Sequence, residues 1–101
     1  MPHESPLNWG YVCDVHTPRA DPRFVLMPPE RVLGRAVKCA FLDRDRPRHE
    51  HMWVQVHSVD PSGNLIGTLD NDPVSNVGIK DGDRVYVKRE AIEAVLPPWE
   101  H

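Results

Sequence analysis

The sequence contains little cysteine and no long apolar run. Its two cysteines, Cys13 and Cys39, form no CxxC pair, which excludes a zinc ribbon and a thioredoxin-like motif. No apolar stretch approaches the roughly 20 residues that a membrane-spanning helix needs. The first ten residues have neither the basic region nor the apolar region of a signal peptide. We therefore predict a cytoplasmic protein without a membrane segment, in which both thiols are buried and free. A disulfide between them requires their two strands to be neighbours.

Positive charge is also scarce. Twelve basic residues face 15 acidic ones, giving a net charge of -3, so the chain has no electrostatic footprint for nucleic acid. Single-stranded nucleic-acid binding is accordingly the least favoured function class. A hydrophobic content of 40% is typical of a folded domain, and a chain of this length builds one core. We expect a single domain that is a monomer or a weak dimer.

Proline is the residue in excess, and it is concentrated near the start. Six of the 11 prolines fall within the first 29 residues. Because proline cannot donate to a β-ladder, this region favours irregular structure and short edge strands. We predict a Pro-rich N-terminal arm over residues 1–33, packed on the domain. It would contain a short edge strand within 9–15, an extended piece at 24–26 and one helical turn that stops at Gly34.

The remainder, residues 34–101, is predicted to be a small β-barrel-like domain. Alternating apolar residues indicate strands near 36–41, 50–59, 65–69 and 84–88, with strong turn signals between them. Met52, Val54 and Val56 form the core row of the second of these strands. Gly67 marks a bulge or a close backbone approach, and residues 89–96 have helical spacing. The predicted fold is all-β with one or two short helices, a small antiparallel meander curled toward an SH3-like barrel.

The opposite row of the second strand is the candidate functional face. It presents three imidazoles and an indole where a solvated strand would carry lysine, glutamate or threonine. Trp53 is either a binding anchor or is covered by the N-terminal arm or by Pro97–Trp99. Tyr86 points outward in this scheme and joins the same aromatic platform. The predicted binding residues of this face are Trp53, His51, Gln55 and Tyr86.

Metal binding is the alternative. His49 and His51, two positions apart on one strand face, can both reach one zinc ion. The candidate third ligand is His57, Glu50 from the opposite row, or an acidic residue of another strand. The acidic residues between 70 and 83 are assigned to turns rather than to a cation site. No nucleophile motif and no phosphate-cradling loop is present. The sequence therefore favours a non-enzymatic protein without a cofactor.

Three short words of sequence resemble a known family. E-H-M-W-V at 50–54, G-T-L-D-N-D-P at 67–73 and G-D-R-V at 82–85 are similar to the YegJ-like family of uncharacterised bacterial proteins, domain of unknown function 2314. The resemblance covers roughly residues 34–96. It implies a compact β domain whose characteristic parts are the Trp53 strand and the loop containing Asn71, which we add to the binding residues. It implies no activity. We expect a bacterial binding module that engages a protein or peptide through the face carrying Trp53.

Overall fold

One six-stranded sheet forms most of the fold. The computed structural model describes residues 11–13 and 17–96. Between the strands lie one short α-helix and two 3-10 turns, and no described helix is long and apolar enough to cross a membrane. The elements are β1 (Tyr11–Cys13), α1 (Arg23–Leu26), η2 (Pro29–Val32), β2 (Ala36–Leu42), β3 (His49–Val59), β4 (Leu65–Leu69), β5 (Arg84–Val87), η3 (Arg89–Ala91) and β6 (Ala94–Leu96).

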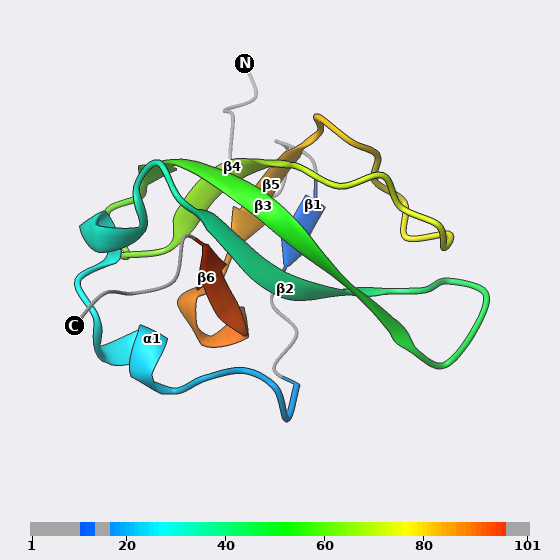
Figure 1. The fold of residues 1–101 in the computed structure, drawn as a ribbon, viewed down its shortest axis with the longest axis horizontal. Coiled ribbons are helices and arrows are strands. Elements are labelled where there is room, and N and C mark those ends of the chain that lie inside the picture. Colours follow the sequence, from blue (N-terminus) through cyan, green and yellow to red (C-terminus); the bar gives the residue numbers. More distant parts are fainter. Residues whose placement is uncertain (1–10, 14–16, 97–101) are drawn as a thin grey trace, which may run out of the picture.

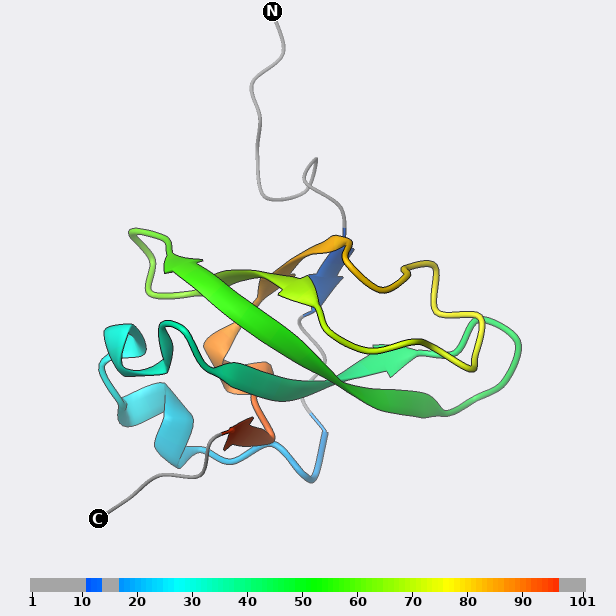
Figure 2. The ribbon, with the colours of Figure 1, turned by 45° about the horizontal axis from the view of Figure 1, so that its top comes forward.

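The sheet has the order β1-β5-β4-β3-β2-β6 and curls into a half-barrel (Figures 1 and 2). Strands β2 to β5 are successive antiparallel neighbours, which confirms the predicted meander. The β1 strand is short and lies at a sheet edge, as predicted, but it pairs in parallel with β5. The curl also brings β1 against β2. At this contact the Cys13 thiol donates a hydrogen bond to the Ala40 carbonyl at 3.2 Å.

The core lies on the concave side of the sheet. The predicted row of Met52, Val54 and Val56 is buried, with no side chain more than 1% exposed, so the strand register is confirmed. Phe24 of α1 and Val32 of η2 belong to the same core. The N-terminal region and the sheet therefore share one core. Its other strand residues include Val37, Cys39, Phe41, Leu65, Leu69, Val85 and Val87.

Gly67 sits at an irregularity of the β3–β4 ladder. The register shifts between Val56 and Ser58, directly opposite this glycine. A Cβ atom added at position 67 would lie 2.1 Å from the Gln55 carbonyl oxygen. Both the predicted bulge and the predicted close backbone approach are therefore confirmed.

Two local predictions are wrong. Residues 24–26, expected to be extended, belong to the helical turn α1, where the carbonyl of Asp21 accepts from the Phe24 N–H at 3.1 Å. In the tail, only Arg89–Ala91 is helical, as a 3-10 turn, and Ala94–Leu96 instead forms β6 beside Ala36–Lys38. The edge of β2 explains the second case, because its backbone groups need partners that a helix in the tail would leave unpaired.

Candidate functional site

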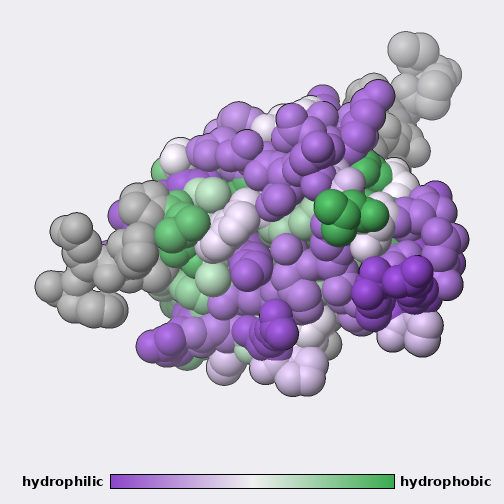
Figure 3. All heavy atoms as spheres, turned by 45° about the vertical axis from the view of Figure 1, so that its right-hand side comes forward, coloured by the Kyte–Doolittle hydropathy of each residue, from purple (hydrophilic) through white to green (hydrophobic). Residues whose placement is uncertain are grey.

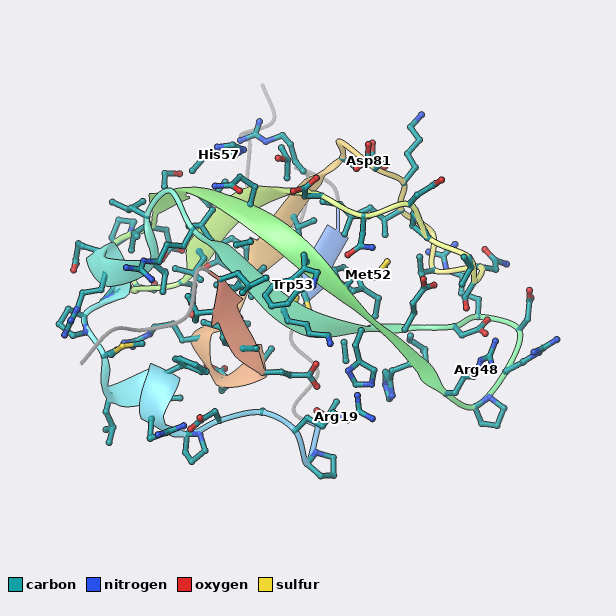
Figure 4. All side chains as sticks on the ribbon, viewed as in Figure 1. Arg19, Arg48, Met52, Trp53, His57 and Asp81 are labelled. Atoms are coloured by element: carbon teal, nitrogen blue, oxygen red, sulfur yellow. The ribbon has the colours of Figure 1, made fainter. Side chains whose placement is uncertain are left out.

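Trp53 occupies the middle of β3 on the convex side of the sheet (Figure 4). Its side chain is half-buried, and its cross-strand neighbour is Lys38 of β2. The Lys38 ammonium lies 5.7 Å from the centroid of the indole ring, within reach of a cation–π contact. We call Lys38, His51, Trp53 and Gln55 the Trp53 face. Residues 97–99, one of the two segments expected to cover the indole, lie outside the described residues.

The loop that follows β4 holds both the N–H and the carbonyl of the Trp53 backbone. The Asn71 side-chain oxygen accepts from the Trp53 N–H at 2.7 Å, and the Asp70 N–H donates to the Trp53 carbonyl at 2.9 Å. Asn71, predicted as a binding residue, thus uses its oxygen to position the strand. The indole therefore stands on a fixed section of backbone, which limits the entropy lost when a partner binds.

Glu50 fixes the same loop further along. Its carboxylate accepts from the Val74 N–H at 3.1 Å and from the Ser75 N–H at 3.0 Å. The Asn71 N–H donates to the Asp81 carboxylate at 3.1 Å, which ties the two ends of the loop together. Residues of all three motifs in the family resemblance meet around this loop. Glu50 comes from the first motif and Asn71 from the second, and the N–H of Gly82, from the third, donates to the carbonyl at the end of β4. The three motifs therefore include residues that fix the loop next to the Trp53 backbone.

His51 is engaged with the tail of the chain. Its Nδ1 lies 2.7 Å from Oε1 of Glu93, and the Thr17 hydroxyl donates to Oε2 of the same carboxylate at 2.5 Å. The Glu93 side chain is 4% exposed and that of His51 22%. Ala40, the cross-strand partner of His51, is fully buried, and its small side chain leaves room for the imidazole to reach past β2. The Glu93 carboxylate therefore joins three segments of the fold, at Thr17, at His51 and in the tail.

The structure does not bring the three candidate metal ligands together. His57 hydrogen-bonds through Nε2 to the Thr68 hydroxyl at 2.9 Å, near the far end of β3 (Figure 4). Six residues of extended strand separate it from His51 by about 20 Å. Within residues 11–13 and 17–96, no group of three histidine, cysteine or acidic side chains is placed to hold a metal ion. A single zinc site built from His49, His51 and His57 is therefore incompatible with this geometry.

Tyr86 is not part of an open platform, contrary to the prediction. The side chain is only 7% exposed. Its hydroxyl donates to the Asp60 carboxylate and accepts from the Asn64 amide at 3.2 Å, so the β3–β4 turn closes over the phenol. Burial raises the pKa of Tyr86, and the hydrogen bond to Asp60 raises it further. Burial also acts to raise the pKa of Asp60, but hydrogen bonds from Tyr86 and from the turn outweigh it and lower that pKa.

We expect Tyr86→Phe to lower the free energy of unfolding at pH 7 by about 1–2 kcal/mol, because the Asp60 carboxylate and the Asn64 amide each lose a partner. Asp60 has a lowered pKa in the folded protein, so its stabilising effect is present above its ordinary value of 3.8 and is lost as the pH falls below it. Urea unfolding of both proteins between pH 3 and 7 checks this. A difference that does not shrink at low pH would contradict the role of the carboxylate.

Sequence reasoning missed the buried polar partners. Glu93 and Thr17 sit in segments without a motif, and their contact spans 76 positions. A glutamate inside the apolar tail A-I-E-A-V was the one available signal. Asp60 and Asn64 were recognised as turn residues but not as partners of a tyrosine. Glu50 was assigned correctly to the face opposite the histidines, and its use as an anchor for loop N–H groups was not foreseen.

The face of the molecule seen in Figure 3 is mainly hydrophilic, with small separate apolar patches. In comparisons with known proteins, neither a curated protein nor a solved structure matches the chain. A family model does match, over residues 29–96, and its description is "Uncharacterized protein conserved in bacteria (DUF2314)". The match includes the whole of the Trp53 face, Asn71 and Glu93. With about two thirds of its length matched, the chain belongs to this family of uncharacterised bacterial proteins.

Proposed function

We propose that the protein is a non-enzymatic binding module that engages a protein or peptide segment through the Trp53 face. The observation that carries the proposal is the half-buried indole at the centre of a convex sheet face, on a backbone section fixed by Asn71 and Asp70. Tryptophan is among the residues most often found as energetic anchors of interfaces. A rigid anchor costs little conformational entropy on binding, which favours this position over a loop residue.

The neighbouring side chains indicate the chemistry of the partner. Lys38 places a cation above the indole, and Gln55, two positions along the same row, adds an amide. An apolar partner side chain could rest on the free part of the ring while an adjacent carboxylate pairs with Lys38. We therefore favour a protein segment with an acidic residue next to an apolar one.

Site-specific cross-linking tests the proposal. A photoreactive p-benzoylphenylalanine in place of Gln55 should give a discrete cross-linked protein on irradiation of cells of the source organism. Adding Trp53→Ala should reduce the yield at least tenfold, because loss of an anchor commonly costs about 2 kcal/mol of binding or more. Thermal unfolding of the Trp53→Ala protein shows whether the fold is retained.

Two controls make the result specific. The same photoreactive residue in place of Ser62, on the exposed β3–β4 turn, should not capture that protein. Leu26→Ala removes a side chain that is 86% exposed on α1, outside the Trp53 face, and should leave the yield unchanged. Equal capture with and without Trp53, in a variant that still unfolds cooperatively, would rule out the indole as the anchor.

A further inference from the structure

Cys13 and Cys39 meet inside the core although their strands are not paired in the sheet. β1 pairs with β5, whereas β2 lies between β3 and β6. Both cysteines are 0% exposed, and both are free thiols. The Cys13 thiol donates to the carbonyl of Ala40, the residue after Cys39, at 3.2 Å, and Cys13 lies close enough to Cys39 to influence the ionisation of its thiol. The curl of the sheet thus brings the two thiols close together inside the core.

We infer that Cys13 and Cys39 form a latent disulfide site, at which a disulfide oxidant such as glutathione disulfide joins β1 covalently to β2. One cysteine thiolate attacks glutathione disulfide, breaking its S–S bond and releasing one glutathione thiolate. The second cysteine then attacks the mixed disulfide, forms the Sγ–Sγ bond and releases the second glutathione. Two cysteine thiols are oxidised, one glutathione disulfide is reduced, and two protons pass to the two departing thiolates.

The site is protected in the resting fold. The neighbouring Cys13 side chain, together with burial and the charge of Glu93, raises the pKa of the Cys39 thiol, which lowers its thiolate fraction. The oxidant reaches the pair only when the three-residue strand β1 leaves the sheet edge. We therefore expect slow oxidation that gives a stable product. The bond would close a loop of about 26 residues, and it would remove from the unfolded chain the freedom to separate β1 from β2.

The effective concentration of the two thiols tests the inference. The full chain is equilibrated in mixtures of reduced and oxidised glutathione, with and without 8 M urea, and then alkylated and weighed by mass spectrometry. We expect the internal disulfide, seen as a loss of two hydrogens and as a linked peptide pair. We also expect its effective concentration to be on the order of a hundred-fold or more higher in the native protein than in urea. The thermal midpoint should rise on oxidation.

Two other outcomes would overturn the inference. The first is an effective concentration in native conditions no higher than in urea, which would mean that the native geometry opposes the bond. The second is glutathione adducts on both cysteines without the internal bond. Cys13→Ser and Cys39→Ser serve as controls, because each should accumulate the single adduct and never the internal bond. The comparison of native and denatured protein uses the unaltered chain, so it stands even if a variant fails to fold.

Discussion

Replacing Gly67 by alanine should destabilise the protein by about 3 kcal/mol or more, a large share of the stability of a small domain. The new Cβ atom would lie 2.1 Å from the Gln55 carbonyl oxygen and 2.9 Å from the Gln55 carbonyl carbon. Both are backbone atoms, so no side-chain rotation relieves the clash. The strands β3 and β4 would have to move apart at the bulge, where Gly67 stands opposite Val56. Urea unfolding at pH 7 measures the loss, and recovery in the soluble fraction gives a first indication.

Gly34→Ala is the matched control for this experiment. A Cβ atom at position 34 meets nothing within 4 Å, although the residue has a φ of +76°. Its substitution should cost only about 1–2 kcal/mol, from the left-handed backbone conformation alone. The contrast between the two variants separates the effect of a backbone clash from the general cost of replacing glycine. A Gly67→Ala protein as stable as Gly34→Ala would show that β3 and β4 are not this close at the bulge.

The strands were predictable because burial on one side of a sheet imposes a period of two. Met52, Val54 and Val56 alternate with polar or half-buried residues, and β4 repeats the pattern with its glycine on the buried side. The sequence contains no comparable pattern that predicts which distant segments pair in the sheet. β1 is only three residues long, and its parallel partner β5 follows more than 70 positions later. In the tail, helical spacing was outweighed by the open edge of β2.

The candidate site was predictable in position but not in its contacts. Alternation placed Trp53 and His51 on the face opposite the core, as the structure has them. It also gave Tyr86 the correct side of β5, yet the β3–β4 turn covers that ring, which no local pattern reveals. The histidine row was read as three equivalent side chains. His51 and His57 instead have different surroundings, because their partners Glu93 and Thr68 come from other parts of the chain.

An N-terminal segment, the tail and β3 meet at the carboxylate of Glu93, and this contact includes His51 of the Trp53 face. Thr17 precedes α1, Glu93 precedes β6, and His51 lies two positions before Trp53 on β3. A buried carboxylate is costly unless it is hydrogen-bonded, and these two partners supply the hydrogen bonds. His51 therefore contributes to the fold directly and to the proposed binding face by holding β3 against the tail. This dual role means that a loss of binding in a His51 variant has to be compared with its stability.

We expect His51→Ala to lower the free energy of unfolding by about 2–3 kcal/mol at pH 7. The substitution removes the imidazole that lies 2.7 Å from Glu93, and it leaves a carboxylate that is only 4% exposed with Thr17 as its remaining partner in these hydrogen bonds. Loss of one partner of a buried, hydrogen-bonded charge is far more costly than loss of a surface contact. Urea unfolding measures the difference.

His57→Ala is the matched control, because it removes the same side chain from the exposed end of the same strand and should change stability by less than about 0.5 kcal/mol. A double-mutant cycle with Glu93→Ala then isolates the contact. If His51 and Glu93 act on each other, the two losses will not add, and the coupling should be about 1 kcal/mol or more. Additive losses would show that His51 stabilises the fold by packing over Ala40. They would contradict the role of the Glu93 carboxylate in connecting β3 to the tail.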